Sequence, residues 1–244
     1  MLPRVLEPIA DDPGVEAEIY REMDHLAVNR RFISDLLDGG STGPHVIDFG
    51  CGPAFIPILL CQFIDEHSGQ GGMSTLPEPD LLRVMGIDSC INMLEMAKFE
   101  LEMAGEVERI QLQQIDLTDP EGLQEEIADT VICNTVLHHL AEPATALRLA
   151  MRCLKSGGRL FVRDLYRPET ETEIEELVRE HTGTAEGIDE LGSDVLSPAQ
   201  LLRQSLHAAL TLQEIRALLK LIGIDPSSVR MTSDRHWTID CRKT

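Results

Sequence analysis

The sequence contains no apolar run close to the roughly 20 residues that a membrane-spanning helix needs. Its first residues, MLPRVLEPIADDPG, lack a basic start followed by a long apolar stretch, so we expect no signal peptide. The six cysteines form no CxxC motif and several have apolar neighbours, which is typical of reduced, buried thiols. We therefore expect a cytoplasmic protein without a membrane span.

Basic residues are scarce. The chain has 21 lysines and arginines against 42 aspartates and glutamates, which gives a formal net charge of −21. Such a charge repels phosphate backbones, so nucleic acid is not an expected partner. Internal repeats and low-complexity segments are also absent from the sequence.

What the sequence does contain is an alternation of short apolar strands with amphipathic helices. With 244 residues and a hydrophobic fraction of 43%, the chain is long enough for one α/β domain with a full core. Strands that alternate with helices of ten or more residues indicate a parallel sheet with helices on both faces. The expected strands are 45–50, 81–88, 110–116, 128–137 and 159–166, and the expected helices between them are 54–67, 91–105 and 143–158.

After Tyr166 the alternation stops, and this change defines the domain organisation that we expect. We predict a single domain over 1–244, with an N-terminal helical segment at 1–39 and a ligand-binding core at 40–166. Residues 167–210 are expected to form a helical cap, and 211–244 a closing helix and two antiparallel strands. Thr211 and Glu214 have the spacing of a capping box at the start of the closing helix.

A glycine loop follows the first expected strand, in VIDFGCGPA. Gly50 and Gly52 fall at the carboxyl end of this strand, where open parallel sheets bind ligands. Glycine there tolerates positive φ and lets backbone N–H groups approach an anion at the start of the next helix. Asp48 would repel a pyrophosphate but attract an ammonium or a sulfonium. A ligand with both charges, such as S-adenosylmethionine, suits this loop.

Polar residues also end the other expected strands. Asp88 can accept hydrogen bonds from both hydroxyls of a ribose. Asp116 can accept from an adenine amine while Leu117 donates its backbone N–H, and Asn134 can meet a methionine moiety. Each residue alone is equally well explained as a turn or helix cap, but four such coincidences favour one binding edge.

These motifs resemble the class I S-adenosylmethionine-dependent methyltransferases. The matching stretches are VIDFGCGPA, GID, QQIDL, DTVICNTVLHHL and LKSGGRLFVRDL, which cover about half of the chain from Val46 to Tyr166. The resemblance is to small-molecule enzymes similar to the ubiquinone/menaquinone type and to uncharacterised bacterial methyltransferases. It implies a Rossmann-like three-layer αβα sandwich, with a seven-stranded, mostly parallel sheet and an antiparallel last strand.

The resemblance also implies S-adenosylmethionine as the cofactor and further contacts to it. Tyr20 is expected to close over the methionine end, a prediction from its position and the family resemblance. Cys51, Ser89 and Met93 complete the expected contacts, although the helical spacing of Met93 with other methionines equally suits a core position. Ala54 replaces the third glycine of the usual loop. The Asn/Asp-Pro-Pro-aromatic motif of amino-group methyltransferases is missing, which disfavours N-methylation of bases.

Three residues are candidates for handling the methyl acceptor. His138 and His139 follow Asn134 by four and five residues, and histidine titrates near neutrality. Asp164, at the end of the fifth expected strand, is a second candidate for a base or a substrate contact. Each histidine could equally be a loop cap or a solvated side chain.

We therefore predict methyl transfer to a small molecule, with an oxygen or carbon nucleophile favoured over nitrogen. One alternative is an NAD-dependent oxidoreductase. The 38 residues from Gly50 to Asp88 exceed the roughly 20 of a dinucleotide fingerprint and argue against it. The other alternative is a non-catalytic methyltransferase-like binding protein. The acceptor's identity stays open, and a homodimer is compatible with the sequence.

Overall fold

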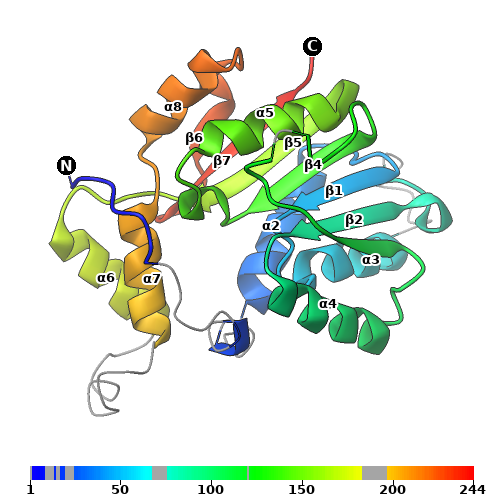
Figure 1. The fold of residues 1–244 in the computed structure, drawn as a ribbon, viewed down its shortest axis with the longest axis horizontal. Coiled ribbons are helices and arrows are strands. Elements are labelled where there is room, and N and C mark those ends of the chain that lie inside the picture. Colours follow the sequence, from blue (N-terminus) through cyan, green and yellow to red (C-terminus); the bar gives the residue numbers. More distant parts are fainter. Residues whose placement is uncertain are drawn as a thin grey trace. The chain divides into compact units, whose positions relative to one another are not determined.

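Seven strands form one sheet in the computed structural model of the chain, in the order β3-β2-β1-β4-β5-β7-β6 (Figure 1). The structure describes residues 2–8, 14, 17–19, 25–67, 76–119, 121–182 and 197–244. The last strand in the chain is antiparallel and the others are parallel, as the sequence predicts. The strands are β1 (His45–Phe49), β2 (Arg83–Asp88), β3 (Ile110–Gln114), β4 (Ala128–Asn134), β5 (Leu154–Leu165), β6 (Val229–Met231) and β7 (His236–Arg242).

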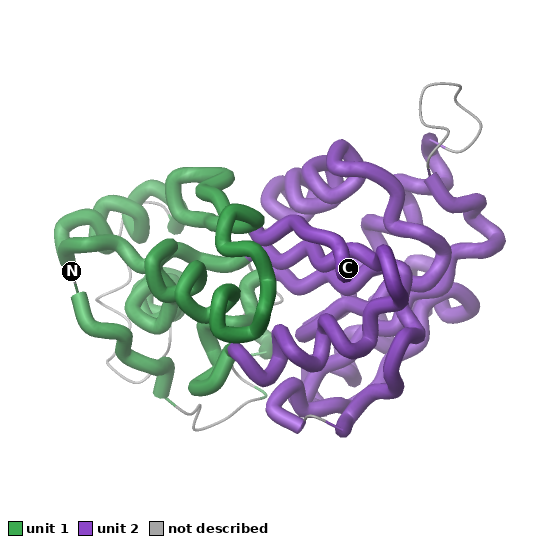
Figure 2. The backbone as a smooth tube through the Cα atoms, turned by 90° about the horizontal axis from the view of Figure 1, so that it is seen from above, with its two compact units in different colours: residues 1–23, 135–143, 164–238 green, residues 24–134, 144–163, 239–244 purple. Residues whose placement is uncertain are grey.

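The chain divides into two compact units, coloured in Figure 2. Unit 1 comprises 1–23, 135–143 and 164–238, and unit 2 comprises 24–134, 144–163 and 239–244. The expected helices are present in the part of the chain that the structure describes, but residues 2–8 of the N-terminal segment, predicted to be helical, are extended or irregular. The helices are α2 (Leu26–Asp38), α3 (Phe55–His67), α4 (Ile91–Ala104), α5 (Pro143–Cys153), α6 (Glu171–Thr182), α7 (Pro198–Ala208) and α8 (Leu212–Leu221), with short 3-10 turns η1 (Pro79–Leu81), η2 (Leu137–His139) and η3 (Pro226–Ser228).

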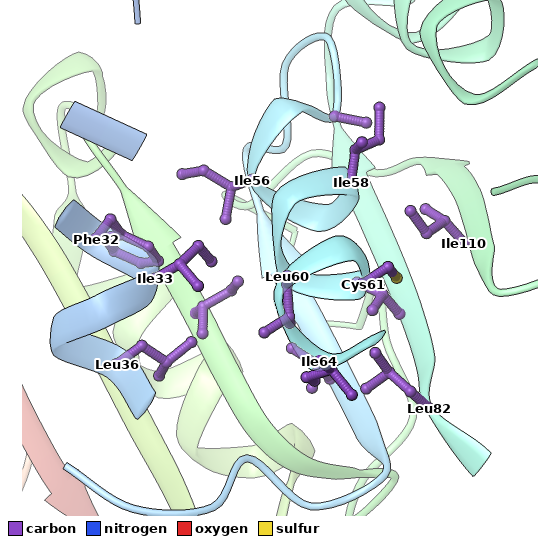
Figure 3. Packing of buried hydrophobic residues seen from close by; sticks show 14 of the residues in the cluster. Phe32, Ile33, Leu36, Ile56, Ile58, Leu60, Cys61, Ile64, Leu82 and Ile110 are labelled. Atoms are coloured by element: carbon purple, nitrogen blue, oxygen red, sulfur yellow. The ribbon is translucent and has the colours of Figure 1, made fainter. Parts of the chain in front are cut away.

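Unit 2 is built on a core between its helices and the sheet. Phe32 and Leu36 on α2 and Leu60 and Ile64 on α3 are fully buried and pack with apolar residues of β1, β2 and β4 (Figure 3). Helices α2, α3 and α4 lie on one face of the sheet and α5 lies on the other (Figure 1). Burying this much apolar side-chain surface fixes the strands whose carboxyl ends carry the expected site.

One helix boundary differs from the prediction. Gly157 and Gly158 do not terminate α5, which ends at Cys153, but lie inside β5. The register of β4 with β5 shifts between Ala128 and Thr130, so this part of β5 is irregular, and Gly157 has a φ of 75°. The sequence could not distinguish a helix stop from a strand bulge, because glycine favours both.

In unit 1, the predicted capping box of α8 is confirmed. The Glu214 amide donates to Thr211 Oγ1 at 3.2 Å, and the Thr211 amide donates to Glu214 Oε2 at 2.8 Å. Helices α6 and α7 pack together over Ile174, Val178 and Leu206, which are almost completely buried. Of the described residues, no helix is long and apolar enough to cross a membrane.

Candidate functional site

The first group of expected site residues lies at the carboxyl ends of β1, β2 and β4 in unit 2. Phe49 on β1 pairs with Ile87 on one side and with Cys133 on the other. Asp88 and Asn134 come one residue later on those two strands. The parallel register therefore brings these strand ends to one edge, as the sequence predicts.

Asp88 is held in place by the backbone around it. Its Oδ2 accepts a hydrogen bond from the Gly52 amide and its Oδ1 accepts one from the Cys90 amide, each at 2.9 Å. The side chain is half-buried. A carboxylate offers about four lone-pair positions, so two remain for further donors such as ribose hydroxyls.

The prediction that the backbone N–H groups of the glycine loop are available to an anion is wrong for its first three amides. The amides of Gly50 and Cys51 both donate to the carbonyl of Ile87, at 2.8 and 2.9 Å, and the Gly52 amide donates to Asp88. The loop folds back on the end of β2, so these three donors stabilise the loop itself. Gly50 and Gly52 have φ values of 69° and 52°, which confirms the need for glycine. Ala54 also has a positive φ, 63°, in the region that strains an alanine.

The side chain of Cys51 is packed against Gly86 on β2, so its position is explained by packing and not by contact with a ligand. A Cβ added to Gly86 on β2 would lie 2.9 Å from Cys51 Sγ, so the thiol occupies the space that this glycine leaves. Burial raises the pKa of the Cys51 thiol far above its usual range, with Asp48 and Asp88 adding to the effect. By contrast, a Cβ at Gly52 would meet no atom within 4 Å, so this glycine borders open space.

Asp48 is almost completely buried, at 2% exposure. Burial raises the pKa of its carboxyl well above the usual value, and the charge of Asp88 raises it further. A buried acid whose ionisation is disfavoured by burial and by a neighbouring carboxylate would gain from a cationic ligand. This is the environment that the sequence reasoning assigned to an ammonium or a sulfonium.

Asp116 lies two residues beyond the end of β3 and is exposed, so the prediction that it ends the strand is wrong. Its Oδ1 accepts from both the amide and the hydroxyl of Thr118 at 2.8 Å, which is the turn-capping role that the sequence also allowed. The neighbouring Leu117 is buried at 5% exposure.

The remaining expected cofactor contacts have mixed surroundings. Ser89 is exposed, and its carbonyl accepts a hydrogen bond from Gln114 Nε2 at 3.1 Å. Met93 is partly buried in the first turn of α4. Tyr20 lies outside the described residues.

The second group of expected site residues is brought together in unit 1. His138 Nδ1 lies 2.6 Å from Asp164 Oδ1, and the His138 amide donates to Asp164 Oδ2 at 3.1 Å. Both side chains are buried, with relative exposures of 3% and 0%. Burial alone would raise the pKa of Asp164, but the charge and hydrogen bond of His138 lower it overall. The carboxylate therefore fixes the orientation of the ring and leaves Nε2 as the nitrogen available for chemistry.

Glu7, which the sequence reasoning did not select, completes this cluster. One of its oxygens lies 3.7 Å from His138 Nε2 and accepts from Ser205 Oγ at 2.5 Å, while the other contacts His139 Nδ1. The centroids of the His138 and His139 rings are 4.0 Å apart. Burial would raise the pKa of Glu7, but the hydrogen bond and charge of His139, with smaller contributions from His138 and Ser205, lower it to about 2.

Arg4 fixes the segment that carries Glu7. Its guanidinium donates to the carbonyls of Ala208, His138 and Leu140 at 2.7, 3.1 and 2.9 Å. The Val5 amide also donates to the carbonyl of His207 at 3.1 Å. These contacts span more than 130 positions of sequence, and no local pattern around Glu7 signals them.

An open groove of about 1190 Å³ in unit 2 lies away from the expected cofactor residues. It runs along β2, β3 and α4, and its lining includes Met85, Leu94, Lys98 and Arg109. None of the expected cofactor contacts lines this groove.

Comparisons with known proteins agree with this fold. Residues 64–162 match a family model described as a methyltransferase domain. Over 156 residues, the chain is 28% identical to the ubiquinone biosynthesis O-methyltransferase of Nitrosomonas europaea, covering 64% of this chain and 57% of that enzyme. The corresponding enzyme of Alkalilimnicola ehrlichii is 27% identical over 157 residues, with 64% and 54% covered. The chain thus spans about half the length of the curated relatives that it matches.

Solved structures show the same fold at low sequence identity. The structure of a SAM-dependent methyltransferase from Aquifex aeolicus matches with a TM-score of 0.54 and 16% identity, covering 96% of this chain and 95% of that one. The S-adenosylmethionine-dependent methyltransferase SibL matches with a TM-score of 0.58 and 18% identity, covering 95% and 60%. The chain is therefore similar to S-adenosylmethionine-dependent methyltransferases, through the family match of residues 64–162 and through its fold.

Proposed function

We propose that this chain binds S-adenosylmethionine at the carboxyl edge of the unit 2 sheet and transfers its methyl group to a small molecule. The observation that carries this proposal is the fixed carboxylate of Asp88. Two backbone amides hold it at the end of β2, and its remaining lone pairs suit the two ribose hydroxyls. Asp48 then supplies a buried acid for the cationic part of the cofactor. Asn134, on the other side of β1, is assigned to the methionine moiety.

The reaction needs little help at the leaving group. A lone pair of the acceptor attacks the methyl carbon, the carbon–sulfur bond breaks, and its electron pair stays on sulfur as a neutral thioether. The acceptor's proton passes to a base. Positioning the acceptor and the methyl group can contribute about 7–11 kcal/mol, and a general base adds about 10²–10⁴-fold in rate.

We assign the base to His138, with Asp164 as the residue that orients it. His138 follows Asn134 by four residues in the sequence, and its Nδ1 is occupied by Asp164 at 2.6 Å. This leaves Nε2 for the acceptor's proton. The nearby His139 is assigned to the acceptor contacts, and residues 167–210 are proposed to be the cap that selects the acceptor.

An oxygen or carbon nucleophile is favoured. The curated relatives include enzymes named for O-methylation in ubiquinone biosynthesis. The net charge of −21 disfavours nucleic acid as the acceptor. The six cysteines form no disulfide in the structure and four of them are buried, which supports a cytoplasmic enzyme.

The test is transfer of label from methyl-labelled S-adenosylmethionine to a fractionated small-molecule extract, with the Asp88→Ala variant as a matched blank. Label in a small-molecule fraction that the variant does not produce supports the proposal. Tight S-adenosylmethionine binding without any transferred label, across extracts that support other methyltransferases, would instead indicate a binding protein.

A further inference from the structure

We propose that Glu7, His138 and His139 bind a divalent transition-metal ion of the Zn²⁺ type. Each of the three side chains offers one ligand atom, and these atoms all lie within 4.8 Å of one another. Two imidazoles and one carboxylate are the ligand set of many catalytic zinc sites and of non-haem iron sites. Imidazole nitrogen disfavours Mg²⁺ and Ca²⁺, which prefer oxygen ligands.

The distance between His138 and Glu7 suits a shared ion better than a direct hydrogen bond. His138 Nε2 and Glu7 Oε1 are 3.7 Å apart, which is too long for a hydrogen bond. Metal–nitrogen and metal–oxygen bonds of about 2.0–2.2 Å place two ligands of one tetrahedral ion roughly 3.4 Å apart. A small adjustment therefore brings both atoms into coordination, and the Glu7 oxygen that contacts His139 Nδ1 turns toward the same ion.

The surroundings of the three ligands are those of a built site. A histidine that binds a metal usually donates its other ring N–H to a carboxylate, which fixes the ring and raises its basicity. Asp164 does this for His138 at 2.6 Å and is itself fixed by the Leu165 amide at 2.6 Å. Ser205 Oγ donates to Glu7 at 2.5 Å and restrains the carboxylate.

The N-terminal segment makes the carboxylate ligand part of the fold. Arg4 joins this segment to the carbonyls of His138 and of Leu140, the residue that follows the two histidines. Three protein ligands leave a fourth position open, as in catalytic zinc sites. Only the use of that position rests on the proposed function: an acceptor oxygen that coordinated there would lose its proton to water more easily. The assignment of His138 as the base then applies to the metal-free chain.

The chain supplies its own control in a second His–acid group. Glu180, His181 and Asp234 also bring their ligand atoms within 4.8 Å of one another. All three residues are exposed, and the group contains one histidine. Exposed acidic groups of this kind are common in proteins without a bound ion.

The test is titration of the metal-free chain with Zn²⁺ by calorimetry, together with the absorption spectrum of the Co²⁺-loaded protein. One ion should bind per chain, with a Co²⁺ spectrum of nitrogen and oxygen ligands and not of cysteine thiolates. Glu7→Gln and His139→Asn should each weaken binding at least 10-fold, and Asp164→Asn by 10–100-fold. His181→Gln should leave binding unchanged. Thermal unfolding of each variant shows whether it is folded.

Zn²⁺ binding that is absent, or that survives Glu7→Gln and His139→Asn in folded protein, would overturn the site. Methyl transfer and S-adenosylmethionine affinity are measured in parallel on the metal-free chain and on the Zn²⁺-loaded chain. If the wild-type chain transfers methyl groups but binds no Zn²⁺, only the metal site is contradicted. Metal binding without methyl transfer, on the same panel of extracts, contradicts only the proposed function.

Discussion

The carboxylate of Asp88, at the end of β2, accepts the amide of Gly52 at 2.9 Å, across the loop that follows β1. This contact links the strand-end acid to the glycine loop, so the two parts of the expected cofactor site depend on each other. Gly52 borders open space, whereas the amides before it are turned inward to Ile87. The loop is therefore held by its own hydrogen bonds, and the acid is the group that we propose to bind the cofactor.

Asp88→Ala should weaken S-adenosylmethionine binding by about 1–3 kcal/mol, or roughly 5- to 150-fold, because hydroxyl donors lose a charged acceptor. Calorimetric titration of the folded variant with S-adenosylmethionine measures this change in affinity. Asp80→Asn is the matched control, since Asp80 is an exposed acid on η1. Equal affinities of Asp88→Ala and the wild type would refute the ribose role.

Asp48→Asn should raise stability and lower cofactor affinity at neutral pH. The folded-state pKa of Asp48 is raised by burial and by Asp88, so the folded chain keeps a proton that the unfolded chain releases. The contribution of Asp48 to the free energy of unfolding is largest below the pKa of the unfolded chain, about 3.9. It falls as the pH rises toward the pKa of the folded chain. Urea unfolding at several pH values should therefore show an advantage of the variant that grows with pH. If the difference in unfolding free energy between Asp48→Asn and the wild type stays constant from pH 4 to 8, the pKa of Asp48 is not raised in the folded chain.

Gly86→Ala should lower the free energy of unfolding by about 1–3 kcal/mol, because the new methyl group overpacks against Cys51. The added Cβ would lie 2.9 Å from Cys51 Sγ. Adding Cys51→Ala removes the closest clashing atom and should recover part of the loss. If the double variant is no more stable than Gly86→Ala alone, the contact with the thiol is not the cause.

His138→Gln should lower turnover by about 10²–10⁴-fold while cofactor affinity stays within twofold. Asp164→Asn should lower turnover as well, because the ring of His138 loses the group that orients it. The comparison needs kcat and cofactor affinity for each variant, with His181→Gln as an exposed histidine control. Unchanged kcat in both variants would show that the cluster takes no part in the reaction.

The sequence predicts the sheet well because most of the parallel strands are short apolar runs separated by helices. The parallel register then brings Asp48, Asp88 and Asn134 to neighbouring strand ends without further information. Local patterns also sufficed for the Thr211 capping box, whose two partners are three residues apart.

What the sequence could not predict depends on contacts between distant segments. The inward turn of the Gly50 and Cys51 amides requires the carbonyl of Ile87, which belongs to another strand. Glu7 joins the histidines only because Arg4 reaches backbone carbonyls far along the chain. Residue type alone gives no sign of either arrangement.

The most direct test of the central claim is calorimetric titration of the wild-type chain with S-adenosylmethionine, S-adenosylhomocysteine and NAD⁺. The account predicts one site per chain for the two adenosyl ligands, weakened by Asp88→Ala, and no measurable heat with NAD⁺. Tight binding of NAD⁺ with no response to S-adenosylmethionine would contradict it.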